Sequence, residues 1–489
     1  MIEVLALTPV LLPMLGAVLT LFLVKYSEKL QETFLVAFFA LLFIINVSYF
    51  IALEYGVAKP LAYGPILLDA PGMFICCLIT FIGTLVIFYS FVYKDEEHYD
   101  KMYFIAYLLL MGMMGGLANT YNVVVMLVFL EAATVISAVL ILFGRTRRAI
   151  KATNTYLAIS IIEVILVVTG AFILYNDSHT LDLHSLNPAS ISDNDKMLLA
   201  MLFFFGFGTK AGLLPLGILW LPSAHSEAPP PISATMSGIL IKASVVAMVK
   251  AVYPFYLMAG FGTLVLVIAA FGITGMLIGV IMALLQEDIK RLLAYHSISQ
   301  MGYIMLGFGL ATPLGVYGAL FHIMNHMLFK GCLFLVTGAL ILRLNTRQIH
   351  NMGGLIKQMP LTAVSFLVAS LAMSGLPLLN GYASKELIYE GSVQAGYPVL
   401  INIPGMNLTI FGIIGWITSG LTFICLMHAF YVIFLGKPKE GLKDVKDPLV
   451  YMMVPILLMA TLCIVIGLFP QLVSGALQFA AAALYGIRI

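Results

Sequence analysis

The sequence predicts an all-α membrane protein with about fourteen transmembrane helices. Three observations support this fold class. Hydrophobic residues make up 62% of the 489 residues and charged residues only 10%, whereas a soluble protein has about a quarter charged residues. The apolar residues come in repeated runs of about 20, which is the length needed to cross a hydrocarbon core. Lysine and arginine are concentrated in alternate loops between these runs.

We interpret the first apolar run as a spanning helix. It has Glu3 where a signal peptide would have basic residues, the run is long, and no small-residue cleavage site follows. Hydropathy then places the spans in order at about residues 5–24, 32–53, 70–93, 102–118, 121–143, 152–175, 197–222, 231–254, 261–285, 292–311, 314–342, 360–395, 408–435 and 449–484.

The distribution of basic residues predicts the orientation of these spans. Loops after odd-numbered spans hold 17 lysines and arginines, among them Lys101 and Lys443, whereas loops after even-numbered spans hold only Lys59 and Lys196. Because cytoplasmic loops carry the excess of basic residues, the odd loops are expected inside and both termini outside. We therefore expect a multi-pass protein of the cell membrane.

The seventh and twelfth spans are interrupted. Pro215 and Gly217 follow Lys210, and Gly375, Pro377 and Gly381 precede Lys385. Such breaks are tolerated only against protein or a water-filled cavity, and matching broken helices indicate repeats around a transport site. Since the two breaks are five spans apart, the repeats would be inverted. The expected division is 1–101 (helices 1–3), 102–254 (first repeat), 255–435 (second repeat) and 436–489 (helix 14).

The segment "GFGTKAG" at residues 206–212 has the glycines, threonine and lysine of a phosphate-binding loop. Such a loop needs a preceding strand and surrounding water, whereas this segment lies between "MLLAMLFFF" and "LLPLGILWLP". Lys210 is therefore expected in the membrane, where a charge costs about 2.5–3.5 kcal/mol even on lenient scales.

Other charges fall at similar depth in neighbouring spans: Glu131, Glu163 and Lys242. One interpretation is that Lys210 pairs with a carboxylate only to hold helices together; the alignment of several charges favours ion translocation. A desolvated lysine releases its proton more readily, and an adjacent carboxylate holds it charged, so separating such a pair acts as a switch. Lys250, near the outer end of its helix, is expected to snorkel to the interface.

The eleventh span carries His322, His326 and Lys330 at i, i+4 and i+8, which is one polar stripe on an apolar helix. The HxxxH spacing could bind zinc, but no third ligand stands out. A proton relay suits the stripe better, because histidine titrates near neutrality.

The five cysteines form no CxxC or CxxCH motif, so the sequence carries no iron–sulfur or haem-attachment signature. We expect no cofactor on this chain, and any redox chemistry in other subunits.

Several motifs spread over about residues 100–440 resemble those of the antiporter-type subunits shared by Mrp Na⁺/H⁺ antiporters, respiratory complex I and membrane-bound hydrogenase or sulfane-reductase complexes. They are "FLEAATVISAVLI", "GFGTKAGLLP", "WLPSAHSEAPPPISATMSGILIK", "LLQEDIKRLLAYHSISQMGYIMLG", "HIMNHMLFKGCLFLVTG" and "GLPLLNGYASKELI". Within that family, the chain looks most similar to the Mrp D-type subunit and its hydrogenase and sulfane-reductase relatives.

The resemblance implies roles for particular residues. Glu131 and Lys210 match the family's helix-five glutamate and helix-seven lysine, Lys242 the connecting lysine of helix eight, His326 the helix-eleven histidine, and Lys385 the helix-twelve lysine. Gly217 and His428 stand where the family often has histidine and arginine. The complete expected translocation set is Glu131, Lys210, Lys242, His326 and Lys385, with Glu163, His322, Lys330 and His225.

The function that the resemblance implies is that of a proton-translocating subunit, driven by redox chemistry in partner subunits of a hydrogenase- or complex I-related membrane complex. The expected partners are other antiporter-like membrane subunits, a peripheral iron–sulfur or hydrogenase-type arm, lipid, and H⁺, with Na⁺ as a further candidate ion, and no nucleic acid. The alternatives are an Mrp Na⁺/H⁺ antiporter component without redox chemistry, and a structural scaffold. The residues leave H⁺ and Na⁺ equally open as the driven ion.

Overall fold

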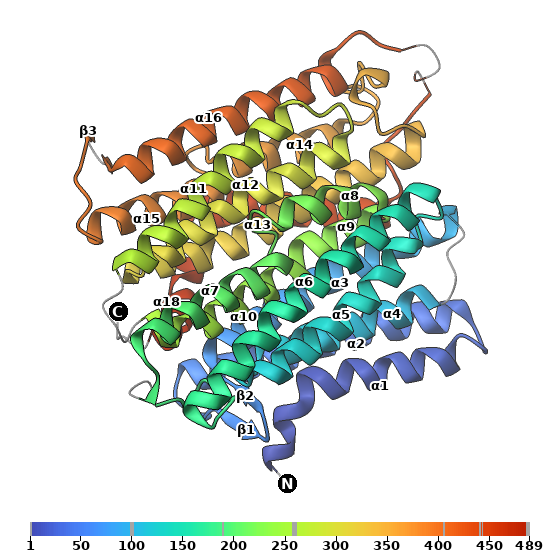
Figure 1. Ribbon diagram of the computed structural model, residues 1–489. Coiled ribbons are helices and arrows are strands. Elements are labelled where there is room, and N and C mark those ends of the chain that lie inside the picture. Colours follow the sequence, from blue (N-terminus) through green and yellow to red (C-terminus); the bar gives the residue numbers. More distant parts are fainter. Residues whose placement is uncertain are drawn as a thin grey trace.

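The computed structural model describes residues 2–97, 102–187, 190–256, 262–403, 406–439, 442 and 444–485. Lys101 and Lys443, two of the basic residues used to predict the orientation, lie outside this part of the chain. Most described residues are helical, and the helices lie side by side along one common direction (Figure 1). The fold class expected from the sequence, an all-α membrane protein, is confirmed.

The described residues up to 256 form the α-helices α1 Thr8–Leu23, α2 Glu28–Glu54, α3 Ala70–Glu97, α4 Met102–Ala118, α5 Val123–Leu142, α6 Arg147–Ser178, α7 Asp193–Lys210, α8 Gly217–Glu227, α9 Pro230–Thr235 and α10 Ile241–Tyr256. The described residues from 262 onward form α11 Gly262–Leu284, α12 Ile289–Gly309, α13 Pro313–Leu344, α14 Pro360–Ser374, α15 Asn380–Gln394, α16 Ile410–Phe430, α17 Val450–Leu468 and α18 Gln471–Tyr485.

Two short antiparallel hairpins were not expected from the sequence. Strands β1 Leu61–Tyr63 and β2 Ile66–Leu68 join α2 to α3, and strands β3 Ile401–Ile403 and β4 Met406–Leu408 join α15 to α16. Each strand has three residues, too few for a period-2 pattern to be recognised among apolar neighbours.

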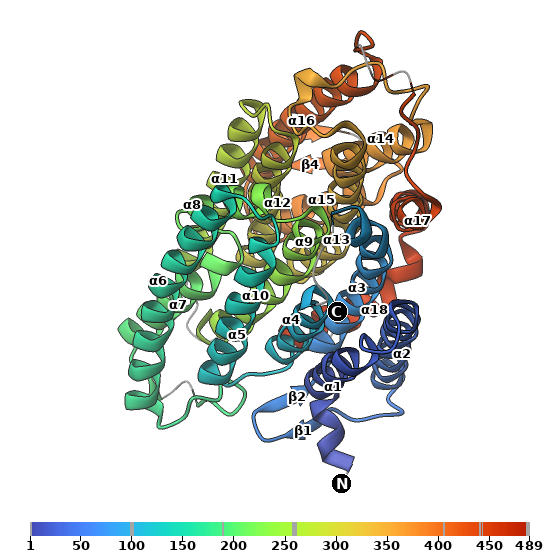
Figure 2. The ribbon, with the colours of Figure 1, turned by 90° about the vertical axis from the view of Figure 1, so that its right-hand side faces the viewer.

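Ten helical segments of the described chain are long and apolar enough to cross a membrane, which supports a multi-pass membrane protein. Their burial separates them into inner and outer helices. The segment that contains α10 is completely buried and α13 is 78% buried, whereas α6 is 33% buried over its apolar window. Figure 2 shows α6 and α17 on opposite flanks with α10 and α13 between them.

Large apolar side chains on the outer helices are exposed, for example Phe172 and Ile161 on α6, at 74% and 62%. A soluble monomer rarely exposes a continuous apolar face of this kind. The exposed face of α6 is therefore suited to contact with lipid chains.

The structure has both helix interruptions that the sequence predicts. The α-helical backbone stops at Lys210 and resumes at Gly217, and it stops again at Ser374 and resumes at Asn380. Gly212 and Gly375 have φ of +77° and +83°, a conformation that only glycine adopts readily.

The carbonyl groups freed at the first interruption are bonded within the protein. Trp220 Nε1 donates to the Thr209 carbonyl at 2.9 Å, and the Leu213 amide donates to the Gly208 carbonyl at 2.9 Å. This agrees with the rule that non-helical backbone at membrane depth must be buried in protein or face a polar cavity.

A further irregularity precedes Lys242. Residues Met236–Leu240 form a π-helical turn between α9 and α10, within a segment that the sequence predicted as one helix. π turns are most often single insertions in an α-helix and are frequent near functional sites.

The predicted final span at 449–484 is wrong in one respect, because the structure divides it into α17 and α18. Phe469, with φ −130° and ψ 64°, ends α17 directly before Pro470. Proline disfavours α-helical geometry at the preceding residue and has no amide hydrogen to continue the helix. The apolar pattern continues through the bend, so hydropathy alone does not detect it.

The tight packing at the second interruption leads to a stability prediction. A Cβ on Gly381 would lie 1.8 Å from the Ala372 carbonyl oxygen, so Gly381→Ala should push α15 away from α14. Overpacking of this kind costs about 1–3 kcal/mol. We expect a lower thermal unfolding midpoint for the purified complex. Gly420→Ala on α16 is the control, because a Cβ there meets nothing within 4 Å; equal midpoints for both variants would contradict the prediction.

Candidate functional site

Lys210, the last residue of α7, is 1% exposed and is held by one face of α6. Its ammonium lies 3.4 Å from Glu163 Oε2, donates a hydrogen bond to Ser160 Oγ, and lies 4.1 Å from the centre of the Tyr156 ring. Tyr156, Ser160 and Glu163 are four and three residues apart and so share a helix face. The C-terminal end of α7 also favours a cation.

The carboxylate within ion-pair distance of Lys210 is thus Glu163 rather than Glu131. Glu131 lies on α5, partly buried, and its Oε1 atom has no hydrogen-bond partner in the structure. Tyr156, Ser160 and Glu163 lie at helical spacing on α6, but the sequence does not show which helix this face contacts, so it could not identify the partner.

Lys242, on α10, is completely buried. Its ammonium donates to the Ser237 carbonyl at 2.9 Å and contacts the Met301 sulfur at 3.4 Å. Ser237 lies in the π-helical turn, so this irregular turn provides the acceptor. Within the described residues, no carboxylate forms an ion pair with Lys242.

The predicted polar stripe of α13 is present and completely buried. His322 joins two neighbouring helices, with Nδ1 2.9 Å from Ser384 Oγ on α15 and Nε2 3.1 Å from Gln300 Oε1 on α12. Both ring nitrogens of His326 lack hydrogen-bond partners in the described part of the chain. The Lys330 ammonium lies 3.8 Å from the Met373 sulfur.

Lys385, near the start of α15, is 2% exposed. Its ammonium donates to the Met373 carbonyl at 2.9 Å and to Ser419 Oγ at 3.0 Å, and it lies 4.4 Å from the centre of the Tyr303 ring. Met373 is in the last turn of α14, where carbonyl groups lack helical partners. The interruption between α14 and α15 therefore supplies an acceptor for the lysine.

His225, on α8, is completely buried, and neither ring nitrogen has a hydrogen-bond partner among the residues that the structure describes. Its ring lies between aromatic neighbours, 6.3 Å from Trp220 and 5.6 Å from Phe334, measured between ring centres. A buried imidazole without a hydrogen bond costs about 1–3 kcal/mol, so a histidine at this position is not explained by packing alone.

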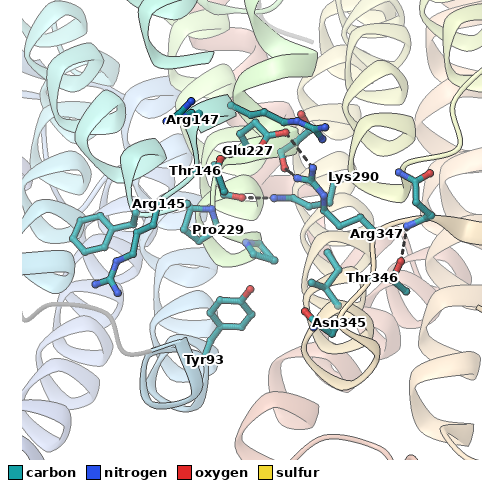
Figure 3. Close-up of a pocket in the computed structure, with 18 residues that line it drawn as sticks. Tyr93, Arg145, Thr146, Arg147, Glu227, Pro229, Lys290, Asn345, Thr346 and Arg347 are labelled. Carbon is teal, nitrogen blue, oxygen red and sulfur yellow. Dashed lines mark hydrogen bonds and ion pairs between the residues drawn. The ribbon is translucent and has the colours of Figure 1, made fainter. Parts of the chain in front are cut away.

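A pocket of about 740 Å³ opens beside the segment that follows His225. Its cations are Arg145, Arg147, Arg148, Lys290 and Arg347. Figure 3 shows Glu227 between Arg147 and Lys290. We call the end of the bundle at which these side chains lie the basic end. In the sequence these cations indicate only the orientation of the spans, and no local pattern predicts the pocket.

Polar contacts connect the residues that line this pocket with neighbouring loops. Arg347 binds Glu227 Oε1 and Asp288 Oδ2, each at 3.2 Å, and donates to the Ser226 carbonyl at 2.6 Å. Lys290 donates to the Ala228 carbonyl. The loops that hold Asp288 and Arg347, both distant in sequence, therefore meet the α8–α9 connection.

The expectation that Lys250 snorkels is wrong. Lys250 is 1% exposed and its ammonium lies 3.1 Å from Asp69 Oδ1. Asp69 precedes α3, 181 residues away in sequence, so hydropathy could not predict the pairing. Lys250 stays buried because this carboxylate provides the opposite charge that compensates for the loss of water.

No group of three or more histidine, cysteine, aspartate or glutamate side chains that could hold a metal ion occurs in the part of the chain that the structure describes.

Residues 120–412 match the NADH:quinone oxidoreductase/Mrp antiporter transmembrane family. Curated relatives include Hydrogenase-4 component B of Escherichia coli, 32% identical over 82% of this chain and 62% of that protein. A Na⁺/H⁺ antiporter protein of Alkalihalophilus pseudofirmus is 31% identical over 94% of this chain and 61% of its own length. An NADH-quinone oxidoreductase protein of Desulforudis audaxviator is 32% identical over 82% of each chain. The chain spans about three fifths of the length of the first two.

Two solved structures share the fold over almost the whole chain. A chain of the membrane-bound sulfane sulfur reductase, an archaeal respiratory membrane complex, superposes with a TM-score of 0.88 at 25% identity, covering 98% of both chains. A chain of the Mrp complex from Dietzia sp. superposes with a TM-score of 0.87 at 22% identity, covering 99% and 98%. Both belong to multisubunit membrane complexes, so membrane partner subunits are expected for a chain with this fold.

Proposed function

The chain belongs to the NADH:quinone oxidoreductase/Mrp antiporter transmembrane family, and from that premise we propose that it is the proton-translocating subunit of a membrane-bound respiratory complex. The complex would be of the class that includes hydrogenases, sulfane reductases and complex I. Redox chemistry in a peripheral iron–sulfur or hydrogenase-type arm would drive translocation, and this chain would carry no cofactor of its own.

One observation carries the proposal: a series of completely or almost completely buried basic side chains on four helices of the bundle. The series is Lys210 on α7, Lys242 on α10, His326 and Lys330 on α13, and Lys385 on α15. Charged side chains at membrane depth are costly and are characteristic of ion pathways. A scaffold would need none of them.

The contacts of these residues support proton transfer. Lys210 has a carboxylate partner, whereas Lys242 and Lys385 donate to neutral backbone carbonyl groups. Separation of Lys210 from Glu163 would favour release of one ammonium proton, and its return would favour recapture. The unpartnered nitrogens of His225 and His326 are polar positions where single water molecules could extend the relay.

We further propose fourteen spans arranged as two inverted five-helix units, residues 102–254 and 255–435, with helices 1–3 before them and 436–489 after. The similar surroundings of Lys210 and Lys385 support this. Each lies beside a helix interruption, over a tyrosine ring and next to a serine hydroxyl. The basic-loop rule would then place the basic end in the cytoplasm and both termini outside the cell membrane.

The second candidate is the D-type subunit of an Mrp Na⁺/H⁺ antiporter. The similarity to a Na⁺/H⁺ antiporter protein and to an Mrp structure favours it. The same lysines and carboxylates would serve H⁺ or Na⁺, so the experiment must distinguish the energy source.

Inverted membrane vesicles containing the whole complex provide the test. We expect acidification, measured with a fluorescent ΔpH dye, after addition of H₂ or NADH, and none in vesicles from a deletion strain. A proton flux that needs only an imposed Na⁺ gradient would support the antiporter instead. Absence of both responses would contradict ion translocation.

A further inference from the structure

Lys250 forms a buried cluster at the end of α10 away from the basic end. Its ammonium pairs with Asp69 Oδ1 at 3.1 Å, donates to the Ala118 carbonyl at 2.8 Å and lies 4.2 Å from the centre of the Tyr121 ring. These partners come from the start of α3 and from the α4–α5 connection. The proposed translocation path does not use this lysine.

The cluster reaches the surface through Asp69 and Tyr121. The Asp69 side chain is 13% exposed, and the Tyr121 hydroxyl donates to Asp69 Oδ2 at 2.5 Å. Tyr121 also lines a pocket of about 570 Å³, which we call the outer pocket, together with Asn122, Asp182 and His184. The outer pocket therefore lies one side chain away from the buried ion pair.

One side of α3, which we call the polar face of α3, continues from Asp69 into the bundle with the side chains of Cys76 and Thr80 and the backbone carbonyl of Gly83. Cys76, Thr80 and Gly83 follow Asp69 by 7, 11 and 14 residues. At 3.6 residues per turn of an α-helix, these four positions fall within about 60° of one another around the helix axis. Asn119 Nδ2 donates to Cys76 Sγ at 3.0 Å, and the Thr80 hydroxyl donates to the Cys76 carbonyl at 2.8 Å.

Two long hydrogen bonds connect the same side of α3 with the residue that precedes the π-helical turn. The Tyr107 hydroxyl donates to the Gly83 carbonyl at 3.5 Å and accepts from the Thr235 hydroxyl at 3.3 Å. Thr235 directly precedes the π-helical turn whose Ser237 carbonyl accepts from Lys242. Polar groups therefore occur beside the ion pair, along one side of α3 and at the turn that holds the central lysine.

We propose that the Lys250–Asp69 pair is an ion gate between the central lysine Lys242 and the outer pocket, with the polar face of α3 as the connection. This inference rests on the proposed function. When the pair separates, the Lys250 ammonium gives one proton to a water molecule in the outer pocket and becomes a neutral amine. A proton arriving along α3 restores the ammonium, and the pair forms again.

A purely structural tie is the competing explanation. The pair joins α3, α4 and α10, and a Cβ on Gly72 would lie 2.4 Å from Asn119 Oδ1 and 2.6 Å from the Ala118 carbonyl oxygen, so packing is close. The two explanations predict different results when Lys250 and Asp69 are both replaced by apolar residues. Replacing both partners of a buried ion pair by apolar residues is often neutral or stabilising. If the pair is only structural, the double replacement should therefore preserve both stability and proton flux, whereas if the pair is a gate, the flux should be lost.

The test is the double variant D69L/K250M in the assembled complex, assayed in inverted vesicles with the ΔpH dye. We expect an unfolding midpoint close to the wild type and a proton flux reduced at least about tenfold, since neither new side chain carries a proton. A flux equal to wild type in D69L/K250M would overturn the gate. D193N/K196M is the control, because it removes an ion pair at the same end of the bundle whose carboxylate is 79% exposed, and its flux should be unchanged.

Tyr121→Phe provides a second measurement if the double variant does not assemble. It keeps the ring beside Lys250 and removes only the hydroxyl that links Asp69 to the outer pocket. We expect the flux to fall several-fold with the unfolding midpoint preserved, and an unchanged flux would overturn the proposal. If wild-type vesicles themselves show no flux, the proposed function fails; if they show flux and the variants match it, only the gate fails.

Discussion

Replacing Lys210 by alanine is expected to reduce redox-driven proton flux to the background of the deletion strain while the complex still assembles. The ammonium is 1% exposed and is held by Glu163 and Ser160. Alanine has no group that carries a proton, so the relay would be broken at the end of α7. The measurement is the initial rate of vesicle acidification, normalised to the amount of assembled complex.

Lys210→Arg separates the need for charge from the need for proton release. Arginine keeps the positive charge but does not release its proton in a protein, so we expect this variant to be as inactive as alanine. Lys357→Ala is the control, because Lys357 is an exposed lysine outside the buried series. Wild-type flux in either Lys210 variant would remove this residue from the pathway.

The second large effect is expected for Glu163→Gln, which removes the carboxylate that pairs with Lys210 and leaves its ammonium buried without that opposite charge. Loss of one partner of a buried pair costs about 3–5 kcal/mol. We expect a lower unfolding midpoint and a proton flux reduced at least about tenfold. Glu131→Gln, outside ion-pair distance, should lower the midpoint much less.

A double-mutant cycle with Lys210→Met tests whether the two residues act together. Contacting residues in one network show interaction energies of about 0.5–3 kcal/mol, so E163Q/K210M should be more stable than the sum of the single effects predicts. Additive effects, or a larger loss in Glu131→Gln than in Glu163→Gln, would show that the 3.4 Å pair is not the functional one.

The sequence predicted which charged residues lie within the membrane better than it predicted their ion-pair partners on other helices. A run of apolar residues around a lysine indicates that the lysine is in the membrane, and Pro215 and Pro377 mark where helices cannot continue. Both inferences use only neighbours in the chain. The two helix interruptions and the polar stripe of His322, His326 and Lys330 could therefore be predicted from the sequence alone.

Partners across helices could not be found in this way, because hydropathy does not specify how neighbouring helices are rotated. Glu131 and Glu163 looked equivalent, and only packing brings Glu163 to Lys210. Lys250 looked like an interfacial lysine because its partner, Asp69, comes from the start of α3. The pocket at the basic end needs three loops to meet around Arg347, and no local pattern contains that information.

The π-helical turn at Met236–Leu240 makes the position of Lys242 depend on the number of residues before it. A π turn is equivalent to one extra residue inserted in an α-helix. Deleting one residue there would restore a regular helix of almost identical composition, yet it would rotate one side of the turn relative to the other by about 100°. Lys242 and the segment that carries His225 would then face different directions. At this point in the chain, a change of length would therefore be more damaging than many changes of residue type.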